Sequence, residues 1–364
     1  TSNVETGLGS ITKKIKDMAM QMAAIATGGS IIRLGQSAVE IGRKFYDGMA
    51  QVKAVTQATD GEMSKLTDTA RELGRTTKFH ATDAAKAMEN LSRGGFNTNE
   101  VLMSINKTLE MAQANAIDLD TSSDVLIRAL RGFKMPVDEK NVSRVADVLS
   151  QASRKSATNV TEMAQAFKNA APFAGALNIP IEQVSAALGV LADSGTRGAD
   201  AGTAMRMALL GLANPTSKAG KVFKEYGITI DQVELKQKGL AGVFEELEKS
   251  GIFKDQNSMA KLSTIFGRRT VSNVINLIGN LDRYKQKLIE VENAQGTTAQ
   301  MFKQSLDPAS NALYTLSSAW EDFKIGLYNL NSGALKGFAE TLTSLIQFMT
   351  ANLPTIAAAI TNLV

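Results

Sequence analysis

The sequence predicts an almost wholly α-helical protein, in which a central domain of several helices is flanked by long helices of the coiled-coil type. Apolar residues recur at every third or fourth position along most of the 364 residues, and only residues 228–230 alternate as a strand does. Aromatic residues make up only 5% of the chain, so packing depends on small and flexible aliphatic side chains, which suit closely spaced helices. Helix-capping residues precede many of the apolar stretches.

Residues 1–60 predict long helices that carry an apolar seam. Their apolar residues recur at alternating spacings of four and three, which is the 3.5-residue period of a coiled coil. Gly28 and Gly29 mark a joint between two such helices. The main seam positions of this segment are Ile15, Met22, Ile41, Phe45 and Val52.

Residues 61–300 predict a central domain of shorter helices. Four stretches place a capping side chain three residues before a carboxylate that can bond back to it, which is the capping-box pattern. These stretches begin at Asn97, Thr121, Asn159 and Asp231. Pro180 fits the first turn of a helix, whereas Pro136 and Pro215 fall in loops between helices.

Residues 301–364 predict further seam helices that end in an apolar segment. Asp307 and Pro308 form a cap and a first helical position, so a long helix follows them. The seam of that helix comprises Leu313, Leu316, Trp320, Phe323, Leu327 and Leu330. The final apolar segment, 353–364, is much shorter than the roughly 20 residues that span a bilayer.

The two seams predict self-association. A lone helix cannot bury a narrow apolar seam against itself, so it needs partner helices. We therefore predict an oligomer interface through the seam residues named above, with Trp320 and Phe323 as its anchors. The mixture of Ala, Trp, Phe and Leu at the core positions does not choose between a dimer, a trimer and higher states.

Composition excludes several kinds of chemistry. The chain has no Cys and a single His, which excludes disulfides, thiolate zinc sites, cysteine nucleophiles and two-histidine metal sites within one chain. We therefore expect no catalytic residue, no cofactor and no metal. The net charge of +4 is spread along the chain, which argues against sequence-specific binding of nucleic acid.

Three local motifs favour a structural interpretation over a chemical one. Residues 118–129 begin like a calcium loop but lack its glycine and its final Glu, so we interpret Asp118 as part of a helix cap. The turn at 194–198 is favoured as a junction in which Gly195 ends a helix, with anion binding as the alternative. His80 lies in a stretch typical of a loop entering a helix, where a surface or capping role is favoured.

A series of short motifs in the central segment resembles the core region of bacteriophage tail tape-measure proteins. The series begins at residues 63–66, continues through 91–96 and ends near 265–267, and the segment 198–203 is its most specific match. We interpret its residues as architectural, because glycines end helices or let helices approach closely. The motif residues are Arg93, Gly94, Gly95, Phe96, Gly198, Ala199, Gly202, Thr203, Phe266 and Gly267.

The resemblance implies a structural protein of the virion and no enzyme. A tape measure sets the length of the tail tube, occupies the tube lumen and tail tip, and is released during genome ejection. The implied partners are further copies of the chain, three by analogy, together with tail tube proteins and tail-tip or baseplate hub proteins. The host membrane is a further partner on ejection, so the implied location is the phage tail and then the host cell envelope.

Two alternatives of other classes stay open at this point. A membrane-active helical protein that forms a pore or channel in the host envelope is motivated by the apolar residues 18–32 and the apolar C-terminal segment. A hydrolase acting on peptidoglycan through an unrecognised carboxylate is the other. We also expect the sequence to be part of a longer protein, because it starts at Thr1 and stops in an apolar stretch.

Overall fold

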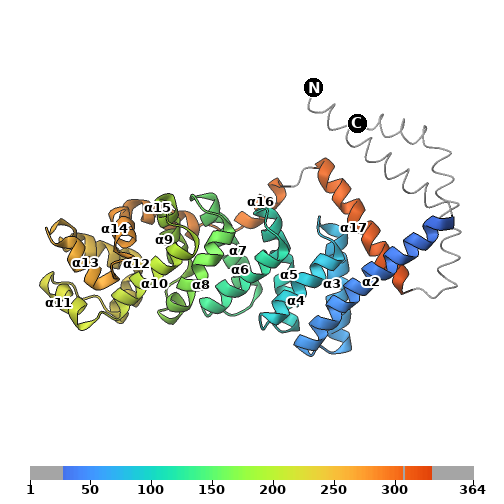
Figure 1. The fold of residues 1–364 in the computed structure, drawn as a ribbon, viewed down its shortest axis with the longest axis horizontal. Helices are drawn as coiled ribbons and strands as arrows, with labels where there is room; N and C mark the ends of the chain where they lie inside the picture. The colour runs from blue at the N-terminus through green and yellow to red at the C-terminus, as the bar shows by residue number, and fades with distance from the viewer. Residues whose placement is uncertain (1–27, 306–307, 330–364) are drawn as a thin grey trace, which may run out of the picture. The chain divides into compact units, whose positions relative to one another are not determined.

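The computed structural model describes residues 28–305 and 308–329 (Figure 1). These residues form α-helices and one short 3-10 helix, and no strand occurs among them. The prediction of an all-α protein is therefore confirmed. Residues 228–230, which alternate as a strand does, lie in an irregular loop between two helices.

The chain divides into two compact units, and each is described by itself. The first unit comprises residues 1–85 and 307–364, and the second comprises residues 86–306. The three segments that we predicted, divided after residues 60 and 300, stay a prediction.

The helices of the first unit are α2 (Gly28–Thr56), α3 (Asp60–Thr76), the start of α4 (Ala81–Arg93) and α17 (Pro308–Tyr328). The second unit begins within α4 and continues with α5 (Thr98–Ala114), α6 (Leu119–Gly132), α7 (Glu139–Arg154), α8 (Val160–Ala176), α9 (Ile181–Asp193) and α10 (Gly198–Ala213). It ends with α11 (Ser217–Glu225), α12 (Gln232–Lys249), η1 (Ile252–Lys254), α13 (Ser258–Phe266), α14 (Val271–Gly279), α15 (Leu281–Glu292) and α16 (Thr297–Gln304).

The second unit is built as two layers of helices. From α5 to α10, each helix packs against the next two helices of the chain, so α5, α7 and α9 form one layer and α6, α8 and α10 form the other. This is the arrangement of a helical solenoid. The chain then returns, because α15 packs on α7 and α9 while α16 packs on α5 and α7 (Figure 1). We call residues 281–304 the return strap.

Six helix ends in the second unit share one geometry. A residue in the left-handed conformation ends the helix, and the N–H of the next residue bonds to a carbonyl five residues earlier, as in the Schellman motif. The left-handed residues are Gly95, Ala116, Lys134, Asn178, Gly195 and Gly227. Gly195 thus ends its helix as predicted. Ala116 and Lys134 were not foreseen, since the left-handed conformation costs such residues roughly 1–2 kcal/mol.

The capping boxes are confirmed in part. Asn97 caps α5 fully, because its side chain accepts from Glu100 N–H at 3.0 Å and Glu100 accepts from Asn97 N–H at 2.9 Å. Asn159 and Asp231 also accept from helix N–H groups. Their answering carboxylates bind elsewhere, however, since Glu162 accepts from a threonine hydroxyl and Glu234 pairs with Lys238.

The capping box predicted at Thr121 is wrong. Asp118 caps α6 instead, accepting from Thr121 N–H at 2.6 Å, so the helix has already begun when the chain reaches Thr121. The Thr121 hydroxyl also donates to Asp118. The interpretation of Asp118 as a helix cap is therefore confirmed.

The layer of α6, α8 and α10 depends on glycines at its helix contacts. A Cβ at Gly202 of α10 would lie 2.3 Å from the carbonyl oxygen of Ala166 in α8. A Cβ at Gly175 of α8 would lie 2.2 Å from the carbonyl oxygen of Gly132 at the end of α6. The backbones of these helices therefore approach one another directly, and any larger residue would force them apart.

Replacing Gly202→Ala is expected to lower the free energy of unfolding by about 1–3 kcal/mol, the usual cost of overpacking a close contact. Urea unfolding followed by circular dichroism would measure this change. Gly220→Ala in α11 is the matched control, because a Cβ there meets nothing within 4 Å, and it should be neutral or stabilising. Equal stability of the two variants would contradict the assigned contact.

Candidate functional site

The two predicted seams lie in the first unit, where α2 and α17 pack against each other. Phe45 and Val52 of α2 are fully buried and Leu327 of α17 is 2% exposed. Within one chain, therefore, α2 and α17 cover these three seam residues, which our argument for partner helices did not foresee. Leu316, by contrast, is 49% exposed.

The other seam residues divide into two groups. The side chains of Ile41, Trp320 and Phe323 are half-buried, and Trp320 stacks on Phe323 with ring centroids 5.2 Å apart. The remaining seam residues lie outside the described part of the chain, by position or by side chain: Ile15, Met22, Leu313 and Leu330. The cap predicted at Asp307 lies outside it as well, although α17 does begin at Pro308. Self-association through the seams stays a prediction.

A polar stripe on α17, made of Ser318, Glu321 and Asp322, docks this helix onto α3 and the start of α4. Glu321 accepts from the N–H and the hydroxyl of Thr82 at 3.1 and 2.9 Å, and so caps α4 from another helix. Asp322 pairs with Arg71 of α3 at 2.6 Å. Residues on a helix turn by about 100° each, so this stripe faces away from Leu316. The seam pattern did not predict this polar stripe, because the pattern consists of apolar residues alone.

His80 lies at the N-terminus of α4, as its sequence context predicts. Its N–H donates to the Asp83 carboxylate at 3.0 Å, and its carbonyl oxygen accepts from the first helical turn. Its Nδ1 atom is 3.3 Å from the Glu321 carboxylate. His80 therefore immediately precedes α4, as expected, but the carboxylates of Asp83 and Glu321, and not its imidazole, accept the N–H groups at this helix start.

Lys287 anchors the return strap of the second unit to the C-terminus of α7. The residue is 5% exposed, and its ammonium donates to the carbonyl oxygen of Lys155 and to the Ser156 hydroxyl, the latter at 2.8 Å. It also pairs with Asp193 of α9 at 2.9 Å. A Cβ at Gly189 would lie 3.3 Å from the Lys287 side chain and 2.5 Å from the Ser156 hydroxyl. The absence of a side chain at Gly189 therefore leaves room for the Lys287 side chain to reach these partners.

The Asp193 carboxylate binds three groups at this anchor. Burial alone would raise the pKa of Asp193, but the N–H of Ala157 and the cations Lys287 and Arg283 outweigh it and hold the pKa below its ordinary value of 3.8. A carboxyl whose pKa is lowered by folding stabilises the fold above its ordinary pKa and loses that effect as the pH falls through the lowered value. The anchor is therefore intact at neutral pH.

Asp147 of α7 fixes the other end of the strap by capping α16. Its carboxylate accepts from the N–H of Gly296 at 2.8 Å and of Thr298 at 2.9 Å. Gly296 is the N-cap residue of α16 and has no side chain to do this itself. Asp147 and Gly296 are 149 residues apart in the sequence, so local spacing could not predict this cap. The only local signal was a helix start without its own capping side chain.

Replacing Asp147→Ala is expected to free the start of α16, since the loss of a helix cap costs about 0.5–2 kcal/mol. Hydrogen exchange of the α16 amides should speed up by a corresponding factor, roughly 2- to 30-fold. Asp124→Ala is the matched control, because among the described residues Asp124 pairs with Arg128 of its own helix, and it is half-exposed. Unchanged exchange in α16 after Asp147→Ala would refute the capping role.

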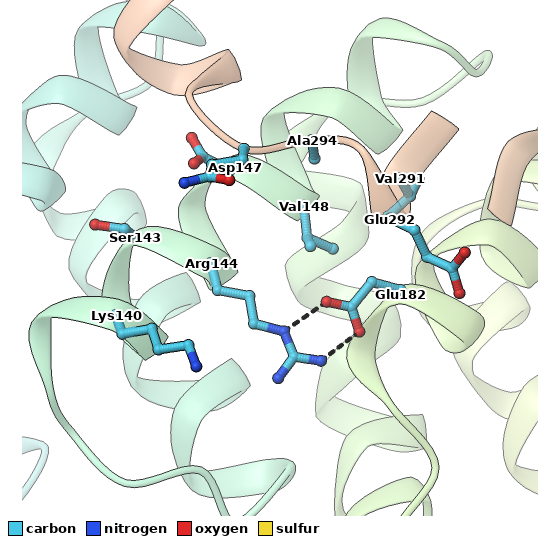
Figure 2. Close-up of a pocket in the computed structure, with 10 residues that line it drawn as sticks. Lys140, Ser143, Arg144, Asp147, Val148, Glu182, Val291, Glu292 and Ala294 are labelled. Carbon is cyan, nitrogen blue, oxygen red and sulfur yellow. Dashed lines mark hydrogen bonds and ion pairs between the residues drawn. The ribbon is translucent and has the colours of Figure 1, made fainter. Parts of the chain in front are cut away.

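A pocket of about 320 Å³ lies beside Asp147, between α7, the first turn of α9 and the bend of the strap (Figure 2). Arg144 and Glu182 cross it as a forked ion pair, with distances of 2.6 Å from Nε and 2.7 Å from Nη2. The hydrogen bond to Glu182 raises the pKa of Arg144 further. The pocket is lined by Lys140, Ser143, Arg144, Asp147, Val148, Glu182, Val291, Glu292, Ala294 and Gln295.

The described part of the chain lacks two other kinds of site. No group of three or more His, Asp or Glu side chains there could hold a metal ion. No helix there is long and apolar enough to cross a membrane. Of the apolar segments that motivated the pore alternative, 18–32 and 353–364, only residues 28–32 lie within the described part of the chain, in α2.

The tape-measure motif residues lie at three separate helix junctions of the second unit. In the first, Arg93 pairs with Glu89 at 2.8 Å, and Phe96 is buried beneath the Arg131 guanidinium, 5.2 Å from its ring centroid. A Cβ at Gly94 would lie 2.6 Å from the Ile127 side chain, and Gly95 has a φ of +85°.

The second junction joins α8 and α10, and the third ends α13. Gly198 has a φ of +55°, and the amide of Asn169 in α8 donates to the Ala199 carbonyl oxygen at 3.1 Å and to the Thr203 hydroxyl at 3.2 Å. Phe266 is fully buried and Gly267, with a φ of +83°, ends its helix. These residues shape junctions and do not converge on one pocket.

The described sites thus define a helical scaffold in which side chains cap helices and tie them together. The chain belongs to the phage-related minor tail protein family, whose model matches residues 67–267. The resemblance to tape-measure proteins, predicted from the motifs, is therefore confirmed.

The chain is similar to curated proteins of three phages. It is 27% identical over 317 residues to the tape measure protein of Pneumococcus phage Dp-1, covering 85% of this chain and 27% of the relative. It is 28% identical over 348 residues to the probable tape measure protein of Escherichia phage P2, covering 91% and 42%. A probable tape measure protein of Clostridium phage phiCD119 is 23% identical over 381 residues, covering 92% and 40%.

The chain therefore spans between about a quarter and two fifths of the length of these relatives. No solved structure matches the chain.

Proposed function

We propose that this chain is the core region of a non-enzymatic tape-measure protein of a phage tail. It sets the length of the tail tube, occupies the tube lumen and the tail tip, and is released during genome ejection. The observation that carries this proposal is the similarity to three tape measure proteins over 85 to 92% of the chain. The absence of Cys and the presence of a single His support a structural role.

The ruler in this proposal is extended helix. A helix rises about 1.5 Å per residue, so the length of a helical chain is proportional to its number of residues. The second unit is folded into two layers and adds little length for its size, which favours a position at the tail tip for it. There it contacts tail tube proteins and tail-tip or baseplate hub proteins, and it reaches the host cell envelope during infection.

In-frame deletions in the full-length phage protein, placed outside residues 28–329, test the ruler. Tails should shorten by about 1.5 Å for each residue removed, and electron microscopy of whole virions would measure them. A phage carrying Gly220→Ala serves as the control and should keep its tail length. Deletion phages whose tails keep the parental length would overturn the proposed ruler.

We further propose that copies of the chain associate through the part of the α17 seam that stays uncovered. The polar stripe of α17 faces α3 and α4, so the 49% exposed Leu316 is left for a neighbouring copy. Its ring-bearing neighbours Trp320 and Phe323 are half-buried on the same seam. An apolar stripe of this kind is typical of helices that pack against helices of other copies.

Mass measurement in solution by light scattering tests this association. The native chain is expected to form oligomers, and Leu316→Asp is expected to lower their mass, because a carboxylate would be buried in an apolar contact. Ile289→Asp in α15 is the matched control, since Ile289 is 60% exposed and lies outside both seams. A native chain that stays monomeric, or equal masses for both variants, would exclude this interface.

A further inference from the structure

The pocket beside Asp147 exists because the return strap bends. Helices α15 and α16 cover the layer of α5, α7 and α9, and the irregular chain between them, 293–296, lines the pocket with Ala294 and Gln295. The uncovered space is about 320 Å³, which is at the lower end of pockets that hold small ligands. Its apolar lining comes from Val148, Val291 and Ala294.

Most of the charged groups in this pocket already have partners. Both carboxylate oxygens of Asp147 accept N–H groups of the strap. Both carboxylate oxygens of Glu182 bind the Nε and Nη2 atoms of Arg144, which is thereby held in one orientation. Glu182 is 8% exposed and Asp147 is 6% exposed, so these four bonds fix the interior of the site.

Lys140 and Glu292 remain without an ion pair among the described residues. Figure 2 shows them on opposite sides of the Arg144–Glu182 pair. The Lys140 ammonium lies on the side of Arg144 that carries the nitrogen not bonded to Glu182. The Glu292 carboxylate lies on the other side, past Glu182 as seen from Arg144. The pocket therefore has a basic end and an acidic end.

We propose that this pocket binds a polypeptide segment of a partner protein that presents an acidic and a basic side chain on either side of an apolar one. The acidic group binds Lys140 and the open nitrogen of Arg144, the basic group binds Glu292, and the apolar side chain rests on Val148 and its neighbours. A guanidinium already fixed by Glu182 loses little freedom when it binds a second carboxylate, which favours binding.

Simpler occupants fit the pocket less well. A small anion would bind at Lys140 but would face Glu292 across the pocket, and a small cation would bind at Glu292 but would face Lys140. The Arg144–Glu182 pair alone would tie α7 to α9 without any occupant. That structural role does not use the open volume between the two charged ends.

A capped pentapeptide of sequence Glu-Ala-Leu-Ala-Lys is the probe for this site. Titrated into the isotope-labelled chain, it should shift the amide signals of Val148, Ala294 and Gln295 in a saturable way. The same peptide with Gln at both charged positions should bind roughly fivefold more weakly, which corresponds to the loss of about 1 kcal/mol of charge contacts.

Lys140→Glu provides the decisive variant, because Lys140 is exposed and unpaired, so the fold should be kept. It makes both ends acidic, and the variant should then prefer a peptide with Lys at both charged positions over the dipolar one. Lys168→Glu on α8 is the matched control, with the same charge change away from the pocket, and should keep the native preference. Absence of saturable shifts, equal binding of the neutral peptide or an unchanged preference in Lys140→Glu would each overturn the proposal.

Discussion

The direct approach of α6, α8 and α10 is the constraint on which the second unit depends. Where these helices cross, glycines take the place of the side chains that usually separate two helices. The backbones of this layer are therefore in direct contact. The other layer, α5, α7 and α9, packs less closely and leaves a surface that the strap crosses. The Arg144 pocket lies on this second layer, where the strap bends.

Both units hold their C-terminal helices through carboxylates that cap a distant helix. Asp147 binds the N-terminus of α16, and Glu321 of α17 binds the N-terminus of α4. A helix N-terminus presents unpaired N–H groups and a partial positive charge, so a buried carboxylate there is both bonded and neutralised. Such contacts are directional, and they specify how each helix sits as well as stabilising it.

These contacts fit a protein whose work is assembly. The motif residues of the phage-related minor tail protein family are found at helix junctions, and the pocket beside Asp147 is the place that we propose for a partner's side chains. The two faces of α17 differ in their contacts. The polar face docks the helix within the chain, whereas Leu316 on the apolar face stays exposed. Joining copies and partners, as we propose for this chain, needs such separate surfaces.

The sequence by itself determined the helical class, several helix starts and the family. Apolar period, capping residues such as Asn97 and glycine ends such as Gly195 act within one or two turns of chain, so local spacing reveals them. It also predicted that the motif glycines shape junctions, although it did not predict that Gly202 meets the Ala166 backbone or that Gly175 meets Gly132.

Only the tertiary structure decided which partners those local elements have. The pairing of Arg144 with Glu182, the caps supplied by Asp147 and Glu321, and the burial of Phe45 by the chain itself all join residues far apart in sequence. A helical period states which face of a helix is apolar, but it does not state which helix will cover that face. That choice depends on how closely the backbones can approach, which is a property of the packed layers and not of any one segment.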